Sequence, residues 1–394
     1  MKDFNAKDFK RYEDTIKKQM IEISNDLYEN PELSGEEYKS KEALKNFLKK
    51  HAFKSEDINF PELETAFIAT YDSGKPGPTI AYLAEYDALP SVGHGCGHNL
   101  IATVSSGAAI LLSKALKDTG GKVLLMGTPA EETYGGKIPM AKAGYFDNVD
   151  IAIMSHPSTE NKISGESLAY HAIELTFEGK AAHAAADPEK GVNALSAMML
   201  TFMGINAMRE HFTDDVRVHG IIADGGAAPN IIPAYTKAKF YLRAQRRKTA
   251  DEVREKFYKI VRGAELMTGS SAHWDSFEYS FDDMNTNKIL NELCTQSMEE
   301  MGMKDISRDT TFKASIDMGN VSYLVPSIHP FFDITNGKDM ALHSKEFAEC
   351  TCTDYAHDQM YKMASSLAIT GLKVLLSPNT MREIRAEFEK SIKK

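Results

Sequence analysis

The stretch His94–Asn99, with the sequence HGCGHN, gathers residue types that bind metal ions into a few positions. The thiol of Cys96 and the imidazole of His98 are a soft ligand and a nitrogen ligand for transition metals. The two glycines can adopt positive φ and let the backbone approach a ligand closely. Taken alone, the loop fits either a metal site or a structural turn. It fails the dinucleotide-binding pattern G-x-G-x-x-G, because His98 stands where the third glycine is required.

Two further buried-type stretches end in residues that bind metals or move protons. A strand expected at 122–129 is followed by Glu131 and Glu132, and a strand expected at 149–155 ends at His156. Adjacent side chains of a strand point to opposite sides, so both glutamates can address one site only after a local turn. One carboxylate could then bind a metal while the other takes a proton from water. Alternatively, the acidic pair could cap the dipole of the next helix.

One histidine near the C-terminus completes a set of ligand types. His343 would be unremarkable alone. The set offers one thiolate, three imidazoles and one carboxylate, from Cys96, His98, Glu132, His156 and His343. These ligands are too many for one tetrahedral structural zinc and suit two divalent ions. The chain has no HExxH motif, which excludes the thermolysin-type single-zinc layout.

The elements that must position these residues alternate between strands and helices. The hydrophobic periodicity predicts strands at 79–86, 122–129, 149–155, 321–325 and 328–334, and helices at 11–28, 36–50 and 99–117, with Asn99 as an N-cap. This alternation predicts an α/β fold with a mainly parallel sheet. Ligands of such sheets bind at the carboxyl ends of the strands, where the candidate residues lie.

A segment of different texture interrupts this pattern. Its order is strand, helix, strand, strand, helix, strand, which is typical of a small split-βαβ, α+β domain. We therefore expect an inserted domain at 167–281 and a main domain made of residues 1–166 and 282–394.

The bulk composition is that of a globular protein. The chain has 394 residues and a formal charge of −10, which argues against general binding to nucleic acids or anionic membranes. No run approaches the roughly 18 apolar residues of a membrane span, and the N-terminus lacks the apolar core of a secretory signal. Four cysteines in such a chain do not form a disulfide framework, so a cytoplasmic location is expected.

The motifs resemble, over nearly the whole chain, a family of di-metal amidohydrolases and metallopeptidases of the M20 type. Its members include aminoacylases, indole-acetyl-amino-acid hydrolases and p-aminobenzoyl-glutamate hydrolase. The motifs that carry the resemblance are HGCGHN, TPAEE, SHP, GKAAHA at 179–184, GGAAPNIIP at 225–233, SIDMGNVS at 315–322 and His343-Ser344. The details at Asn99 and at 317–322 are closest to the p-aminobenzoyl-glutamate hydrolase and aminoacylase-like dipeptidase branch.

The resemblance implies a fold and a division of labour. The fold would be a phosphorylase/hydrolase-like three-layer catalytic domain with an inserted ferredoxin-like lid, through which the chain would form a homodimer. Two divalent ions, Mn or Zn, would be held by the five ligands named above. Glu131 would be the general base, and Asp87 would orient a ligand imidazole. His183 on the lid would stabilise the oxyanion in a partner subunit's site, Asn230 would bind substrate, and Arg243 could pair with a substrate carboxylate or simply face solvent.

The function expected from the resemblance is metal-dependent hydrolysis of the amide bond of small N-acyl amino acids or dipeptides. A p-aminobenzoyl-glutamate-like substrate and a basic dipeptide both remain open. A dinucleotide-binding oxidoreductase is disfavoured by the failed glycine spacing. A metal-binding scaffold without activity is opposed by the presence of Glu131 beside a full ligand set.

Overall fold

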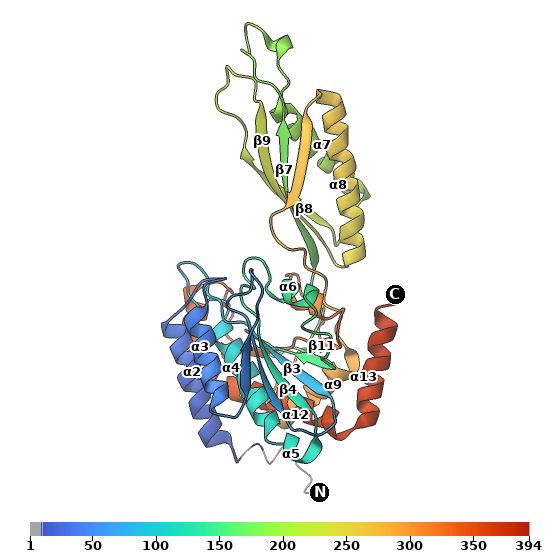
Figure 1. Cartoon of the computed structure of the whole chain (residues 1–394). Coiled ribbons are helices and arrows are strands. Elements are labelled where there is room, and N and C mark those ends of the chain that lie inside the picture. The colour runs from blue at the N-terminus through green and yellow to red at the C-terminus, as the bar shows by residue number, and fades with distance from the viewer. Residues whose placement is uncertain (1–8, 10, 394) are drawn as a thin grey trace. The chain divides into compact units, whose positions relative to one another are not determined.

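The chain folds into two units, for which the computed structural model describes residues 9 and 11–393 (Figure 1). Unit 1 comprises Met1–Glu166, Met284–Phe312 and Asp317–Lys394. Unit 2 comprises Ser167–Asp283 together with the short segment Lys313–Ile316. A short piece of chain beyond the expected insertion therefore also belongs to unit 2.

The centre of unit 1 is a six-stranded mixed sheet. Its strands, in the order β1-β2-β4-β3-β5-β11, are β1 (Lys54–Asp57), β2 (Phe67–Asp72), β4 (Lys122–Gly127), β3 (Thr79–Ala84), β5 (Ile151–Ile153) and β11 (Ser327–Ile328). The pairs from β4 to β11 are parallel, whereas β1-β2 and β2-β4 are antiparallel. A second, two-stranded parallel sheet pairs β6 (His156–Ser158) with β12 (Phe331–Asp333).

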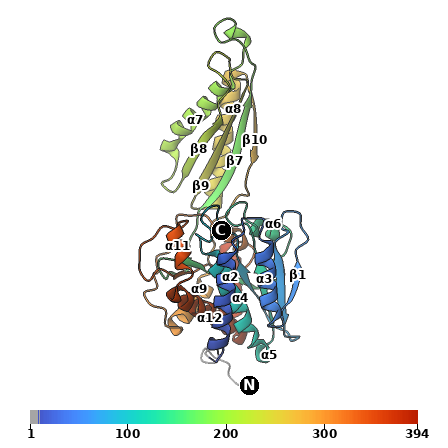
Figure 2. The same ribbon diagram turned by 90° about the vertical axis from the view of Figure 1, so that its left-hand side faces the viewer.

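Helices cover this sheet and enclose the main hydrophobic core (Figures 1 and 2). The helices of unit 1 are η1 (Glu13–Lys17), α2 (Lys18–Glu29), α3 (Tyr38–Lys49), α4 (His98–Ser113), α5 (Leu116–Thr119), α6 (Lys137–Lys142), α9 (Lys288–Glu300), α10 (Met318–Val321), α11 (Lys345–Cys350), α12 (Asp354–Leu376) and α13 (Pro378–Ser391). Every residue of α4 is buried, because this helix packs against β3 and β4 and also against α2 and α12. A side chain at Gly107 would place its Cβ only 2.6 Å from the Met20 sulfur, so small residues are what allow this close packing.

Unit 2 is a ferredoxin-like α+β domain. Its elements are β7 (Ala169–Glu178), η2 (Pro188–Lys190), α7 (Ala194–Met208), η3 (Arg209–His211), β8 (Arg217–Asp224), β9 (Tyr235–Ala244), α8 (Arg247–Thr268) and β10 (Ser271–Ser276). The four-stranded antiparallel sheet has the order β10-β7-β9-β8. Helices α7 and α8 lie side by side and enclose a second hydrophobic core with the sheet (Figure 1).

Three sequence expectations about local structure are corrected. The strand expected at 321–325 is wrong: Met318–Val321 is a helical turn, so Val321 and Val325 lie on one side of a turn and not along a strand. Helix α4 begins at His98 with Gly97 at the N-cap, and Asn99 instead donates its side-chain amide to Ser24 Oγ at 3.1 Å. The antiparallel strands β1 and β2 were not expected, since β1 is a short, charged and largely exposed edge strand.

Within the described part of the chain, no helix combines the length and the apolar character that crossing a membrane requires.

Candidate metal centre

The loop between β3 and α4 places Cys96 and His98 at the carboxyl end of the sheet. Gly97 adopts φ +77, in the left-handed region that favours glycine. A Cβ on Gly97 would lie 2.4 Å from the ring of Pro157, next to His156, and a Cβ on Gly95 would lie 3.3 Å from the Cα of His343. The glycines therefore let this loop approach two other segments that carry candidate ligands.

A strained turn after β4 orients Glu131 and Glu132. Ala130 has φ +59, an uncommon conformation for a residue with a Cβ. Two buried carboxylates hold the backbone there: Glu37 Oε1 accepts from the Ala130 N–H at 2.9 Å, and Asp87 Oδ2 accepts from the Glu132 N–H at 3.0 Å. This is the local turn that two adjacent glutamates need in order to address one site.

Asp87 also holds the imidazole of His98. The Nδ1 of His98 donates to Asp87 Oδ1 at 3.0 Å, which fixes the tautomer and leaves Nε2 to face Glu132. Burial by itself would raise the pKa of Asp87, but the His98 imidazole and the hydrogen bonds to its oxygens hold that pKa below its ordinary value. The position expected for Asp87 behind a ligand imidazole is thus the position that it occupies.

His156 and His343 approach the same site from two other segments. His156 Nε2 lies 3.4 Å from Cys96 Sγ, and burial followed by the nearby His98 lowers the pKa of His156 to about 4. Its ring is therefore neutral at pH 7, the form that binds metals. His343 adopts φ +61 and places Nε2 at 3.5 Å from Glu132 Oε1.

The five side chains form overlapping groups that are suited to cations. Ligand atoms within 4.8 Å of one another define the groups Cys96/His98/His156, Cys96/Glu132/His343 and His98/Glu131/Glu132. His98 Nε2 and Glu132 Oε1 are buried without a hydrogen-bond partner, although such atoms normally have one. Two orphaned ligand atoms among soft, nitrogen and oxygen donors fit a pair of divalent ions that share Cys96 and Glu132. The residues present thus fit the implied metals.

A buried ionic cluster borders Glu131 on the other side. Lys137, fully buried, donates to Glu85 and, at 2.7 Å, to Asp317 Oδ1. Burial by itself would raise the pKa of Glu85, but the Lys137 ammonium holds it below its ordinary value. Burial, followed by the charges of Glu85 and Asp317, raises the pKa of Glu131 well above its ordinary value. Glu131 therefore binds a proton more readily than an exposed glutamate does, as a base that must accept one should.

The three remaining candidates lie on unit 2. His183 pairs with Ile231 in an isolated bridge, and the carbonyl of Asn230 accepts from the Ala184 N–H at 3.0 Å, so His183 and Asn230 are neighbours. His183 Nδ1 accepts from the N–H groups of two following residues at 3.3 and 3.2 Å. The neutral imidazole therefore carries its proton on Nε2, where it can donate to an oxyanion.

Arg243 is more constrained than a free carboxylate-binding arginine. Its guanidinium lies over the rings of Tyr170 and Tyr241, at 5.2 and 5.1 Å from their centroids. Its Nη1 donates to Ser315 Oγ at 3.1 Å. One edge of the guanidinium is thus engaged within unit 2.

Sequence reasoning missed four charged residues around the Glu131–Glu132 turn: Glu37, Glu85, Lys137 and Asp317. Glu85 stood two positions before Asp87 at the end of the same strand, which was a usable signal. Lys137 and Asp317 are 180 residues apart in sequence, and Glu37 and Ala130 are 93 apart. No local pattern shows such pairings.

Glu37→Gln should change how the stability of the metal-free protein depends on pH. Burial, followed by the charge of Asp87, raises the pKa of Glu37 from 4.5 to about 7. A carboxyl with a raised folded-state pKa contributes full stability below the unfolded-state pKa and loses it as the pH rises through the folded-state value. Between about pH 4.5 and 7 the wild type should lose on the order of 3 kcal/mol through this group, and Glu37→Gln should not.

Urea unfolding at pH 5 and pH 8 measures this difference. The exposed neighbour Glu36 provides the matched control, Glu36→Gln, which should follow the wild type at both pH values. If Glu37→Gln loses as much stability over this interval as the wild type, the carboxyl of Glu37 is not the group that titrates.

Comparisons with known proteins agree with this geometry. Residues 169–266 match the peptidase dimerisation domain family. The chain is 37% identical to the Xaa-Arg dipeptidase of Mus musculus over 93% of this chain and 88% of the relative. It is 27% identical to one of the two kinds of chain of the p-aminobenzoyl-glutamate hydrolase of Escherichia coli, over 93% of this chain and 91% of the relative.

Solved structures share the fold at lower identity. An aminobenzoyl-glutamate utilization protein from Klebsiella pneumoniae superposes with a TM-score of 0.72 at 18% identity, covering 93% of this chain and 98% of that one. A dinuclear metal binding peptidase from the M20 family of Bacillus subtilis superposes with a TM-score of 0.68 at 19% identity, covering 92% and 99%. The comparisons confirm the resemblance seen in the sequence motifs and the α/β fold with an added dimerisation domain. This chain belongs to the M20 family of metallopeptidases and amidohydrolases.

Proposed function

We propose that this protein is a metal-dependent dipeptidase that hydrolyses the peptide bond of dipeptides with a C-terminal arginine. Amide hydrolysis of small N-acyl amino acids or dipeptides is the activity of its relatives. The proposed choice of a dipeptide rests on the 37% identity to the Xaa-Arg dipeptidase over 93% of the chain. The observation that carries the chemistry is the meeting of four candidate ligand segments around Glu131 and Glu132.

In the proposed reaction Cys96, His98, Glu132, His156 and His343 hold two divalent ions. When bound, the ions would polarise the scissile carbonyl and make the attacking water more acidic. Glu131 takes one proton from that water as it attacks the carbonyl carbon. It then passes the proton to the amine that leaves when the C–N bond breaks. Water thus supplies OH to the new carboxylate product and H to the amine product.

Unit 2 is proposed to act as the lid. His183, with its proton on Nε2, donates to the oxyanion in a partner subunit's site, and Asn230 binds the substrate beside it. Arg243 is proposed to meet a substrate carboxylate through the edge of its guanidinium that Ser315 does not occupy.

Release of free amine from a substrate panel tests the proposal. The panel holds alanyl-arginine, alanyl-glutamate, p-aminobenzoyl-glutamate and N-acetyl-methionine, each with Mn²⁺, with Zn²⁺ or with chelator. Chelator-sensitive release with the highest kcat/KM for alanyl-arginine is expected. Release from the acyl amino acids without release from alanyl-arginine would contradict the dipeptidase assignment and leave the amidohydrolase class intact.

An exposed apolar face on unit 2 supports the proposed homodimer. Met199 and Met203 project one turn apart from α7 and are 54% and 64% exposed, and Ile221 on the edge strand β8 is 65% exposed. An edge strand with exposed apolar side chains is a pairing surface for a second copy. Figure 2 shows α7 and β8 in the same unit.

Ile221→Lys combined with Met203→Glu should shift the protein from dimer to monomer in light scattering. The added charges would have to be desolvated between the two copies, a cost of several kcal/mol. Leu376→Lys, at a residue of unit 1 that is 55% exposed, is the matched control and should stay dimeric. A double variant that remains dimeric at micromolar concentration would place the interface elsewhere.

A further inference from the structure

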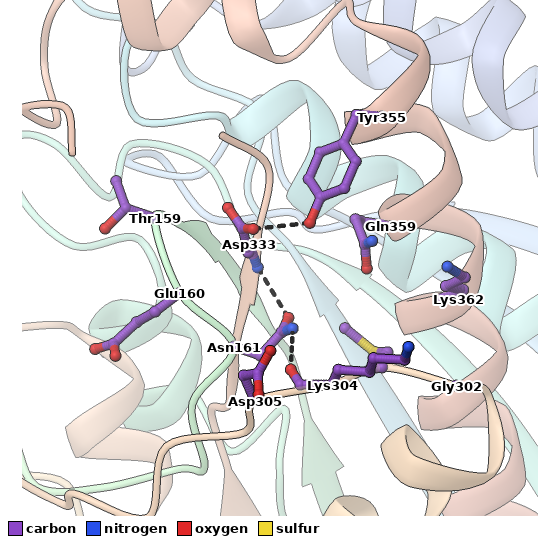
Figure 3. Close-up of a pocket in the computed structure, with 11 residues that line it drawn as sticks. Thr159, Glu160, Asn161, Gly302, Lys304, Asp305, Asp333, Tyr355, Gln359 and Lys362 are labelled. Carbon is purple, nitrogen blue, oxygen red and sulfur yellow. Dashed lines mark hydrogen bonds between the residues drawn. The ribbon is translucent and has the colours of Figure 1, made fainter. Parts of the chain in front are cut away.

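A pocket of about 410 Å³ lies in unit 1 at the carboxyl end of the sheet formed by β6 and β12 (Figure 3). Its walls are the segment 159–161 after β6, the segment 302–305 after α9, the last residue of β12, and one face of α12. None of these residues belongs to the candidate metal centre. The volume lies within the range of pockets that bind small molecules.

The walls of the pocket are fixed to one another. Asn161 donates through Nδ2 to the carbonyl of Lys304 at 2.8 Å and accepts through Oδ1 from the Asp333 N–H at 3.0 Å. Asp333 in turn accepts from the Tyr355 hydroxyl at 2.7 Å. Burial, followed by this hydrogen bond, raises the pKa of Tyr355, so the phenol stays protonated. Three separate segments are thus joined before any ligand arrives, which lowers the cost of ordering a bound molecule.

One buried acceptor in this pocket has no donor. Gln359 is only 7% exposed, and its Oε1 has no hydrogen-bond partner among the described residues. In Figure 3 this oxygen points into the space between Asp333, Lys304 and Lys362. A buried acceptor is costly unless a donor meets it, so the molecule that fits here brings an N–H or O–H group.

The charges of the lining residues specify the donor further. Three carboxylates line the pocket, from Glu160, Asp305 and Asp333, against two ammonium groups, from Lys304 and Lys362. The Lys362 ammonium is already paired with Asp358 at 2.7 Å. The lining therefore favours a ligand with a net positive charge, and the lysines on one side can receive a carboxylate.

We infer that this pocket is a second ligand site that binds a free basic amino acid, with a guanidinium or ammonium side chain. The cationic group donates to Gln359 Oε1 and faces Asp333, and the ligand carboxylate faces Lys304 and Lys362. The inference does not depend on the proposed dipeptidase activity, because binding here requires neither metal nor turnover.

Titration calorimetry on the metal-free, full-length protein tests the inference with L-arginine, its uncharged analogue L-citrulline, and inorganic phosphate. L-Arginine should bind at least tenfold more tightly than L-citrulline. Gln359→Met, which keeps the side-chain length and removes the acceptor, should weaken L-arginine binding at least tenfold. Gln359→Glu adds a negative charge and should tighten it.

Opposite effects of these two variants distinguish recognition from damage, since a packing defect would weaken binding in both. His343→Ala at the candidate metal centre is the second control and should leave the heat of L-arginine binding unchanged. The inference is overturned if both Gln359 variants bind like the wild type, if binding is lost in His343→Ala, or if phosphate binds and L-arginine does not.

Discussion

Glu131→Gln should lower kcat by about 10²–10⁴-fold, the range by which a positioned proton-transfer group accelerates a reaction. Glutamine keeps the shape of glutamate but cannot accept the proton of the attacking water. Stability should not suffer, because burial and two neighbouring carboxylates raise the pKa of Glu131 and thus disfavour its charged form. A neutral side chain suits this position at least as well as an ionised one in the metal-free protein.

Single-turnover and steady-state rates on the best substrate of the panel, together with metal analysis, measure this effect. The variant should retain its bound metal, because the five proposed ligands are untouched. Glu62→Gln changes an exposed glutamate in the same way and should leave kcat unchanged. A Glu131→Gln enzyme that turns over at the wild-type rate would sink the assignment of Glu131 as the base.

Lys137→Met should destabilise unit 1 by about 3–5 kcal/mol, the cost of breaking a buried ion pair by removing one partner. Lys137 is fully buried and is the cation that both Glu85 and Asp317 contact. Methionine fills most of the space but leaves two buried carboxylates without their counter-charge. Their pKa values would then rise, so the deficit should grow as the pH increases.

Urea unfolding of the metal-free protein measures this loss. Lys122→Met is the matched control, since Lys122 and Asp72 form an ion pair between side chains that are 50% and 44% exposed. Such a surface pair contributes about 0–1 kcal/mol. Adding Asp317→Asn to Lys137→Met should recover part of the loss, because one uncompensated charge is removed. If the double variant is no more stable than Lys137→Met, the loss comes from packing and not from charge.

The sequence predicted those parts of the site that lie in one local motif. Cys96, His98, Glu132 and His156 each follow a buried strand, and strand ends of one sheet meet at one edge. The supporting residues could not be predicted in this way. Glu37 at the start of α3 holds the Ala130 N–H across 93 residues of sequence. Its role depends on the tertiary path of the chain, which hydrophobic periodicity does not specify.

Local propensity also misled where tertiary contacts decide the structure. The apolar residues at 321–325 have the composition of a strand, yet the Ser322 N–H bonds to the carbonyl of Met318 and closes a helical turn. Asn99 has the chemistry of an N-cap but is drawn into the core by Ser24 and Thr351. The expected parallel centre of the sheet is present, whereas its antiparallel edge lacks any strong pattern because β1 is charged and exposed.

The division of the chain places a covalent tether beside the base. The segment Lys313–Ile316 belongs to unit 2, where the carbonyl of Ala314 accepts from the Leu168 N–H at 2.8 Å. The next residue, Asp317, belongs to unit 1 and holds the buried ammonium of Lys137. No slack chain separates the two. Any displacement of the lid strand at Leu168 therefore pulls, through a single peptide bond, on a carboxylate that neighbours Glu131.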